Sequence, residues 1–277
     1  MRFFRTLTTI LATLLALFGP SNAILAESND NIVIKGSTTI LPIAQSVASA
    51  FEYHSQGVKV QVSGGGSAEG IVALIMGEAD IAASSSFITQ DEVLLAQLRS
   101  VYPVPFRIAN DCILPVVHKS NPLRDIRSED LKKIYRGQLN NWSQLGGPDL
   151  EIDAISRDTA SGTYDVWHHI IMQGESVVTD LPLKHSNTEV VQAVASNPAA
   201  IGYISLGYLN ANVKPLKVDG IMGSQRTLLD GSYLINRPLF MFTNSWPDGR
   251  TLEFINFVLH PQKGQPLIKE AGYIPLY

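Results

Sequence analysis

Three short segments of the chain combine glycine with serine or threonine, and each lies between an expected strand and an expected helix. The segments are residues 36–39, 63–70 and 157–163. Hydroxyl groups and the free N–H groups at a helix start are hydrogen-bond donors, and the helix dipole is positive at that end. Such positions attract anions. Because all three segments provide donors and none carries an obvious general base, the sequence predicts anion binding rather than catalysis.

The first segment holds Ser37, Thr38 and Thr39, just before an expected helix with Pro42 near its start. Proline fits the first turn of a helix, and serine and threonine are common helix caps. Two interpretations are open. The hydroxyls only cap the helix, or they and the first backbone amides also face a ligand.

The second segment has four glycines in eight residues and contains Ser67. Glycine allows a backbone to come close to a ligand. The segment is not a P-loop, because no Gly-Lys-Ser/Thr follows. It is not a nucleophile elbow centred on Ser67 either, because Glu69 stands where that motif needs glycine. A plain tight turn is the alternative.

The third segment places Arg157 four residues before Ser161, which Gly162 and Thr163 follow. A guanidinium can hold an oxyanion through two parallel N–H donors. We therefore expect this segment to provide both a positive charge and a helix N-terminus. Alternatively, Asp158 pairs with Arg157, and the pair only stabilises the loop.

Other residues with metal-binding or reactive side chains fit structural roles better. His168 and His169 are adjacent, so on a helix their side chains point about 100° apart, which suits a shared metal ion poorly. The single cysteine, Cys112, lies in an apolar run and is expected to be a buried, unreactive thiol. We expect no metal and no cofactor. Asn187 and Thr188 resemble a helix cap, and would add donors to the site if that helix faces the cleft.

The N-terminus has the order of a secretory signal. A basic start precedes an apolar run over residues 7–18, and Gly19-Pro20 and small residues follow. The run is shorter than the ~20 residues that a membrane-spanning helix needs. We expect residues 1–23 to be removed by cleavage after Ala23, with Ala26 as the alternative. Because no cysteine directly follows, we expect no lipid anchor and a periplasmic location. A retained membrane anchor is the other interpretation.

Length and composition limit the class of protein. The chain has 277 residues, of which 45% are hydrophobic and 17% charged, with a net charge of -4. This is enough for one large domain or two medium lobes with real cores. A nucleic-acid-binding protein normally carries a basic excess, so we expect no nucleic-acid partner. A loose basic stretch at 119–133 is expected to be a solvated face, with contact to a membrane permease as the alternative.

Strand-like and helix-like stretches alternate along the chain. Strands are expected at 32–34, 58–62 and 80–83, with helices at 41–51 and 70–76 between them. This βαβαβ order predicts an α/β lobe with a mainly parallel sheet. The later elements are an extended crossover at 101–118, helices at 128–135, after 162, at 189–195 and at 251–258, and strands at 152–156, 201–204, 233–235 and 239–242.

Two lobes are therefore expected, with a ligand site in the cleft between them. Lobe 1 is expected to be discontinuous and to comprise residues 28–108 plus 208–277. Lobe 2 is expected at residues 109–207.

The chain resembles the phosphate-binding proteins of high-affinity phosphate transporters. The resemblance covers almost everything after the expected signal, and its most specific part is residues 157–163. It implies an α/β, two-lobed periplasmic-binding-protein fold of type II, in which each lobe is a mixed sheet flanked by helices and the ligand lies in the cleft. By resemblance, the anion-binding residues are Ser37, Thr38, Thr39, Ser67, Arg157, Ser161, Gly162 and Thr163.

The same resemblance implies a binding protein and not an enzyme. Such a protein captures phosphate in the periplasm and delivers it to the membrane permease of an ABC transporter. It is expected to act as a monomer.

One position departs from the family pattern. Well-known members carry an aspartate that accepts the proton of hydrogen phosphate and repels sulfate, and Ser85 stands at the matching position here. We count Ser85 among the ligand-binding residues. A serine hydroxyl can donate or accept a hydrogen bond, so it selects less strongly between phosphate and sulfate. Glu69 and Asp80 are nearby carboxylates that could supply the acceptor instead.

Three alternative functions are open. The first is a binding protein for another tetrahedral oxyanion, such as sulfate or molybdate. The second is a secreted phosphoester hydrolase with Ser67 or Ser161 as its nucleophile, which would need a base or a metal beside the serine. The third is a ligand sensor or adhesive surface protein with the same fold.

Overall fold

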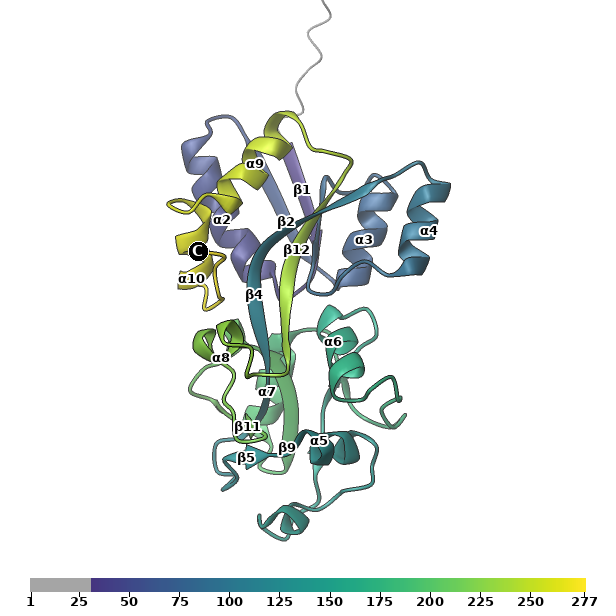
Figure 1. The fold of residues 1–277 in the computed structure, drawn as a ribbon, viewed down its shortest axis with the longest axis vertical. Helices are drawn as coiled ribbons and strands as arrows, with labels where there is room; N and C mark the ends of the chain where they lie inside the picture. The colour runs from purple at the N-terminus through teal and green to yellow at the C-terminus, as the bar shows by residue number, and fades with distance from the viewer. Residues whose placement is uncertain (1–30) are drawn as a thin grey trace, which may run out of the picture.

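The fold consists of an upper and a lower lobe joined by two long strands (Figure 1). The structure, a computed structural model, describes residues 31–277. The expected signal and both cleavage positions lie outside the described residues. Within residues 31–277, every helix is too short or too polar to cross a membrane.

The upper lobe begins with the predicted βαβαβ unit. Its elements are β1 (Asn31–Gly36), α2 (Leu41–His54), β2 (Lys59–Gly64), α3 (Ser67–Ile75) and β3 (Ile81–Ser84). Strand β1 pairs in parallel with both β2 and β3, which confirms the predicted parallel arrangement. In such a sheet the loops after β1, β2 and β3 all leave the same edge, so the helices that follow start side by side.

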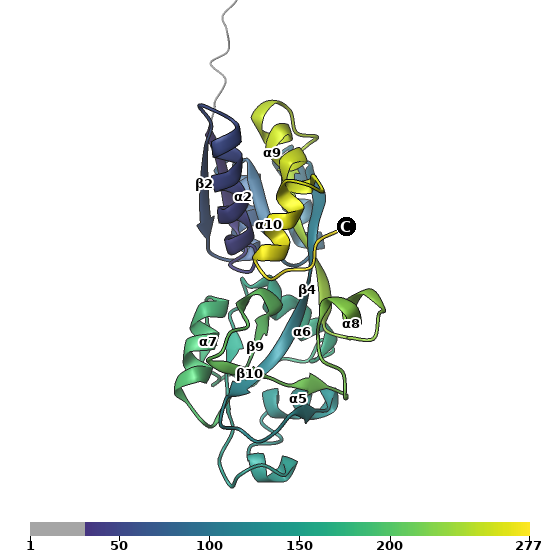
Figure 2. The ribbon, with the colours of Figure 1, turned by 90° about the vertical axis from the view of Figure 1, so that its left-hand side faces the viewer.

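Helices cover both faces of the upper sheet. Helix α2 packs with α9 (Gly249–Leu259) and α10 (Gly264–Glu270) on one face, and α3 packs with α4 (Gln90–Leu98) on the other (Figures 1 and 2). Neighbouring side chains of a strand point to opposite faces. Accordingly, Ala83 and Met241 join the core under α2, whereas Ala82 and Phe242 join the core under α3.

Helices α4 and α10 were not predicted. Helix α4 has little apolar periodicity, and only Ala96 among its residues is buried. Its start is fixed by a capping box, in which the Thr89 hydroxyl accepts the N–H of Glu92 and the Glu92 carboxylate accepts the N–H of Thr89. That is a local polar signal rather than a hydrophobic pattern.

Two antiparallel strands cross between the lobes. These are β4 (Pro103–His118), which realises the predicted crossover as one long strand, and β12 (Asn236–Asn244). The sheet order β2-β1-β3-β12-β4-β9-β6 therefore runs without a break through both lobes. The strand predicted at 233–235 is wrong: Tyr233 is instead a buried residue whose hydroxyl donates to the carbonyl of Ile113.

The lower lobe is built around the second half of β4. Its remaining strands are β5 (Asp125–Ile126), β6 (Asp153–Ala154), β7 (Ser156–Arg157), β8 (Leu183–Lys184), β9 (Ala200–Ser205), β10 (Val213–Pro215) and β11 (Lys217–Val218). Its helices are α5 (Ser128–Tyr135), α6 (Gly162–Ile170), α7 (Asn187–Ser196) and α8 (Gln225–Leu229), with short 3₁₀ turns at Trp142–Leu145 and Leu206–Tyr208. The strand predicted at 152–156 is split into β6, which pairs with β9, and β7, which pairs with β8.

The lower core is aromatic. Trp167 of α6 stacks on Tyr203 of β9 with the ring centroids 4.2 Å apart and the planes 5° from parallel. The Tyr203 hydroxyl bonds to the Ser156 hydroxyl at 2.9 Å and accepts the backbone N–H of Arg157 at 3.1 Å. The core therefore fixes the strand end from which Arg157 projects.

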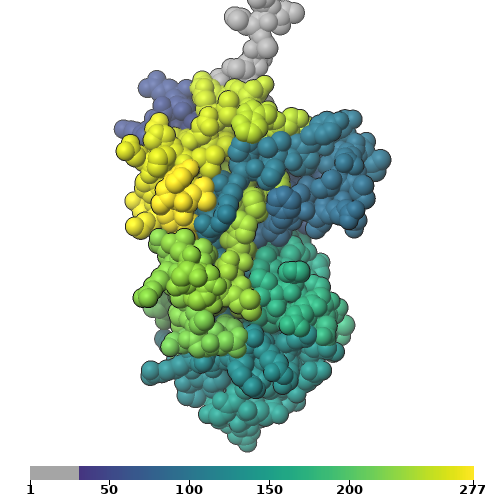
Figure 3. All heavy atoms as spheres, viewed as in Figure 1, coloured from purple at the N-terminus to yellow at the C-terminus, as the bar shows by residue number. Residues whose placement is uncertain are grey.

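The hydrophobic clusters suggest where the chain changes lobe. Residues from Val213 to Ile235 contribute side chains to the cluster of the lower lobe, whereas Leu239 and Met241 belong to that of the upper lobe. We propose that the return to lobe 1 occurs within β12, near residue 236, instead of at residue 208. The two lobes meet at the narrow waist where β4 and β12 cross (Figure 3).

Candidate anion-binding site

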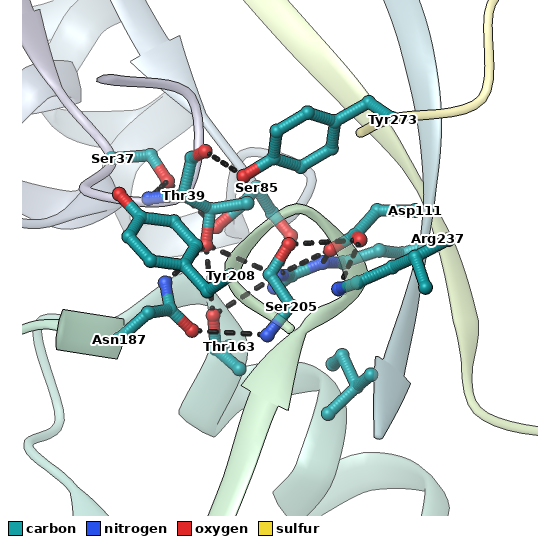
Figure 4. A network of polar contacts seen from close by, with 12 residues as sticks. Ser37, Thr39, Ser85, Asp111, Thr163, Asn187, Ser205, Tyr208, Arg237 and Tyr273 are labelled. Atoms are coloured by element: carbon teal, nitrogen blue, oxygen red, sulfur yellow. Dashed lines mark hydrogen bonds and ion pairs between the residues drawn. The ribbon is translucent and has the colours of Figure 1, made fainter. Parts of the chain in front are cut away.

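The predicted hydroxyl-rich segments meet between the two lobes. The N-termini of α2 and α3 approach from the upper lobe, and that of α6 approaches from the lower lobe. The hydroxyl oxygens of Thr39 and Thr163 are 3.1 Å apart across this junction, and both side chains are buried (Figure 4). The backbone N–H of Ala68 also donates to the carbonyl of Ala160 at 3.3 Å. The lobes are thus in contact at the site.

On the upper side, three buried serines form a connected group. The Ser37 hydroxyl donates to that of Ser85 at 2.9 Å. The Ser67 hydroxyl accepts the backbone N–H of Ser85 at 3.0 Å and lies 3.3 Å from the Ser85 hydroxyl. Ser85 therefore lies among the predicted site residues.

The backbone of the first segment is held by two tyrosines (Figure 4). The Tyr208 hydroxyl donates to the carbonyl of Thr38, and the Tyr273 hydroxyl donates to that of Thr39, each at 2.6 Å. Burial raises the pKa of Tyr208 to about 12, so the phenol keeps its proton at neutral pH. Both tyrosines bond to backbone carbonyls, so the hydroxyl groups of Thr38 and Thr39 are not used by these contacts.

Arg157 projects into the site from the lower lobe and is 1% exposed. Its Nε donates to the carbonyl of Lys184 and its Nη2 to that of His185, both at 2.9 Å. Nη2 also lies 3.3 Å from the hydroxyl of Thr38, across the lobe junction. Nη1 is buried and has no hydrogen-bond partner among the described residues. Burial lowers the pKa of Arg157, but a guanidinium remains protonated in proteins.

An unpaired buried donor on a charged group is costly, so the free Nη1 indicates that an acceptor is missing from the protein itself. Asp158 does not fill that role. Its Oδ1 accepts the N–H of Ala160 at 2.9 Å, and its buried Oδ2, 3.3 Å from the Nδ1 atom of His185, has no hydrogen-bond partner among the described residues.

The start of α6 uses its residues in different ways. The Ser161 hydroxyl caps the helix by accepting the N–H groups of Thr163 and Tyr164. Gly162 packs against the upper lobe, where an added Cβ atom would lie 2.5 Å from the hydroxyl oxygen of Ser67 and 2.8 Å from that of Ser85. Glycine is therefore required for the two lobes to come this close.

Sequence reasoning missed Arg237 and its partner Asp111. Both side chains are almost fully buried, and Arg237 Nη2 lies 2.9 Å from Asp111 Oδ2 (Figure 4). The same Nη2 is 3.0 Å from the Thr163 hydroxyl and 3.2 Å from that of Thr39. One signal was available in the sequence: Asp111 lies within an apolar strand and Arg237 lies beside another. Charged residues in such strands are seldom buried unless they are paired, so the two could have been matched as partners.

Asn187 also belongs to the site. Its Nδ2 donates to the Thr39 hydroxyl at 3.2 Å, so α7 does face the cleft. The prediction that Asn187 and Thr188 cap the helix is wrong, because the cap is Ser186, whose hydroxyl accepts the N–H of Glu189.

Neither carboxylate considered as a substitute acceptor lies at the site. Asp80 is exposed and accepts the N–H of Val33, near the far end of β1. Glu69 is exposed and lines a separate surface hollow. Among residues 31–277, no group of three or more His, Cys, Asp or Glu side chains could hold a metal ion. Cys112 is buried, as predicted, and burial raises the pKa of its thiol to about 12, which disfavours the reactive thiolate.

A second carboxylate lies at the lobe junction and should make binding depend on pH. The Ser86 hydroxyl of the upper lobe donates to Asp165 Oδ2 of the lower lobe at 3.1 Å, and burial raises the pKa of Asp165. Because Asp165 is buried against Ser86 of the other lobe, we expect contact between the lobes to favour the protonated acid. The protonated Asp165 therefore stabilises the contact between the lobes. This stabilisation is fully present below the ordinary pKa of aspartate and is lost as the pH rises through the raised pKa.

We therefore expect Asp165→Asn, which keeps an acceptor for Ser86 but removes the charge, to increase anion affinity at neutral pH. The increase should be about two- to fivefold, since the group is partly exposed and screened. Calorimetric titrations at pH 7.5 and pH 5 would show the gap between variant and wild type narrowing at the lower pH. An equal or weaker affinity of the variant at pH 7.5 would contradict this role.

The fold and the site together define a two-lobed binding protein with a buried, donor-rich site at the lobe junction. The chain belongs to the PBP superfamily, since residues 21–262 match the model of a PBP superfamily domain.

Within that superfamily, the chain is similar to phosphate-binding proteins. It is 29% identical to the phosphate-binding protein PstS of Borreliella burgdorferi over 90% of this chain and 91% of that protein. It is 30% identical to PstS of Staphylococcus aureus over 86% of this chain and 76% of that protein.

Two solved structures share the fold. A phosphate ABC transporter substrate-binding protein of Clostridium perfringens with bound phosphate has a TM-score of 0.83 and 28% identity, and covers 89% of this chain and 100% of its own. An ABC-type phosphate transport receptor of Vibrio cholerae has a TM-score of 0.72 and 30% identity, and covers 88% and 99% respectively. These similarities confirm the predicted two-lobed fold and the predicted family.

Proposed function

We propose that this protein binds inorganic phosphate between its lobes and delivers it to an ABC transporter. The observation that carries the proposal is the buried Nη1 of Arg157, which has no partner among the described residues. The same guanidinium reaches the first hydroxyl-rich segment, where its Nη2 lies 3.3 Å from the Thr38 hydroxyl. A bound oxyanion would accept from this guanidinium and from free backbone amides. The names of the relatives, which are phosphate-binding proteins and transport receptors, support the choice of ligand.

We propose Ser37, Thr38, Ser67 and Ser85 as contacts from the upper lobe. Thr39, predicted as a further contact, instead lies against the Thr163 hydroxyl and supports it. From the lower lobe we propose Arg157, Thr163 and the backbone N–H of Gly162. The N–H of Ser161 donates to the carbonyl of Asp158 at 3.2 Å, so Ser161 supports the site by capping α6. Equilibrium dialysis with radiolabelled phosphate, competed by sulfate and by molybdate, tests the choice of anion. The proposal is supported if excess unlabelled phosphate displaces the radiolabelled phosphate and sulfate at the same concentration does not. If sulfate or molybdate displaces the label more strongly than phosphate does, that anion would be the ligand.

Ser85 is the position at which we expect the choice between phosphate and sulfate to be adjustable. An aspartate there would accept the proton of hydrogen phosphate and repel sulfate, which has no proton to donate. We expect Ser85→Asp to increase the ratio of phosphate to sulfate affinity about tenfold, the scale of one hydrogen bond to a charged group. Ser85→Ala, which also removes the hydroxyl but adds no charge, is the matched control. An unchanged ratio in Ser85→Asp would mean that position 85 does not face the ligand.

Hydrolysis of phosphoesters has little support. Among the described contacts, Ser67 bonds only to Ser85, and the Ser161 hydroxyl caps α6. A nucleophilic serine needs an adjacent base, and neither contact provides one. The names of the relatives, phosphate-binding proteins and a phosphate ABC transporter substrate-binding protein, support binding instead.

We also propose that the protein is a periplasmic monomer, released by cleavage after Ala23 without a lipid anchor, and that it docks on a membrane permease. The transporter partner is supported by the names of the structural relatives. N-terminal sequencing and intact mass of the exported protein test the cleavage and the absence of a lipid. A mature protein that retains residues 1–23 or carries an acyl chain would overturn this part.

A further inference from the structure

Arg237 lies beneath the site on β12, one of the two strands that cross between the lobes. Its Nε and Nη2 donate to Asp111 Oδ2 at 3.0 and 2.9 Å, and its Nη1 donates to the carbonyl of Ser85 at 3.0 Å. Nη2 also faces the hydroxyls of Thr39, from the upper lobe, and Thr163, from the lower lobe. One guanidinium thus contacts both halves of the proposed site.

Asp111 is fully occupied and cannot accept a bond from a ligand. Its Oδ1 accepts the Ser205 hydroxyl at 2.8 Å and the N–H of Leu206 at 3.1 Å, while its Oδ2 accepts two N–H groups of Arg237. A carboxylate has about four acceptor positions, and all four are used. Asp111 therefore does not replace the acceptor that is absent at position 85, and it serves to hold Arg237.

The neighbouring hydrogen bonds indicate which hydroxyl donates and which accepts in the Thr39–Thr163 pair. Nη2 carries two hydrogens and faces three acceptors, so the hydrogen that points away from Asp111 is shared between the two threonine hydroxyls. The Thr39 oxygen also accepts from Asn187 Nδ2, whose amide orientation is fixed because Asn187 Oδ1 accepts the N–H of Ser205. The geometry of the 3.1 Å Thr39–Thr163 contact allows either hydroxyl to donate. We assign the donor role to Thr39, because Asn187 and Arg237 both donate toward its oxygen and together occupy its two lone pairs.

The same reasoning fixes the role of Thr163. Its oxygen accepts from Thr39 and from Arg237, which uses both of its lone pairs. Its own proton has no acceptor among the described contacts and is available to a ligand. Without Arg237, a lone pair of Thr163 would be free, and the hydroxyl could act as either donor or acceptor.

Building on the proposed function, we propose that Arg237 is a positioning residue that makes Thr163 an obligatory donor to the bound oxyanion. The ligand must then present an unprotonated oxygen at this point, and any proton it carries must face the serines 37, 67 and 85. Arg237 also brings a second positive guanidinium close to the anion. Because Arg237 contacts Thr39 of the upper lobe and Thr163 of the lower lobe, the orientation of the Thr163 hydroxyl depends on the lobes being in contact.

A double-mutant cycle measured by calorimetry tests the proposal. One change is Thr163→Val, and the other replaces the buried ion pair by the neutral pair Arg237→Gln with Asp111→Asn. In the wild-type background we expect Thr163→Val to weaken phosphate binding roughly ten- to hundredfold, the loss of one hydrogen bond to a charged group. In the neutral-pair background the same change should cost less than threefold. Thr163→Ser, which keeps the hydroxyl, should restore most of the affinity only when Arg237 is present.

Equal losses from Thr163→Val in both backgrounds would overturn the proposal, because a residue that sets the donor role of Thr163 must couple energetically to it. If the neutral pair does not fold, Arg237→Lys serves as the second background, since it keeps a cation beside Asp111 but lacks the planar pair of donors, and the coupling should again fall. Measuring the same cycle with sulfate distinguishes failure of the phosphate assignment from failure of the role proposed for Arg237. Wild-type protein that binds sulfate and not phosphate would overturn the phosphate assignment while the sulfate cycle still tests Arg237. Binding of neither anion would overturn both.

Discussion

Arg157→Ala should remove most of the affinity for phosphate. The side chain is 1% exposed and its Nη1 has no partner among the described residues, so in the bound state it should donate directly to the anion. Removing one partner of a buried, hydrogen-bonded charge pair costs about 2–5 kcal/mol, which is roughly a 30- to 5,000-fold increase in Kd. Calorimetric titration of ligand-stripped protein with phosphate measures this directly.

Arg124→Ala is the matched control, because it removes an exposed arginine from the same lobe. Its Kd should stay within about twofold of wild type, which would show that the effect of Arg157 is local and does not come from net charge. Near-wild-type binding by Arg157→Ala would mean that the anion does not lie at this junction.

Gly162→Ala should weaken binding by a different route, through the approach of the lobes. The added Cβ atom would lie within 3 Å of the Ser67 and Ser85 hydroxyl oxygens and of the backbone N of Ser86. Overpacking costs about 1–3 kcal/mol, and three such contacts place the cost near the upper end, or roughly 150-fold in Kd.

We expect the lobes to separate when no ligand is bound. The ligand-free protein should then tolerate this change, because alanine is favourable in a helix and the clash arises only where the lobes meet. We therefore expect the melting temperature without ligand to stay within a few degrees of wild type, while the stabilisation by phosphate is largely lost. A large fall in the melting temperature of the ligand-free variant, with phosphate affinity retained, would show that the glycine serves the fold of the lower lobe only.

The parts of the site that could be predicted are those encoded locally. The segments 36–39, 63–70 and 157–163 each join a strand end to a helix start, so hydroxyls, glycines and the direction of the helix could be seen together in the sequence. The parallel order of β1, β2 and β3 followed from the same alternation, and it explains why the first two segments lie side by side.

Arg237 and Asp111 could not be placed in this way. They are 126 residues apart, and only the antiparallel pairing of β4 with β12 brings them into register. Strands are predicted at 233–235 and 239–242, so Arg237 falls between two predicted strands. In the structure it lies inside the single strand β12. The contacts that connect the three helix N-termini are therefore a property of the tertiary fold, and local patterns do not contain them.

The measurement that tests the central claim most directly is titration calorimetry of the purified protein, stripped of ligand by partial unfolding and dialysis, with phosphate and sulfate in separate runs at pH 5 and pH 8. We expect one phosphate to bind per chain, more tightly than sulfate at both values, with the Arg157→Ala variant losing this binding. Tight binding of sulfate alone, or of neither anion, would contradict the assignment of the site to phosphate.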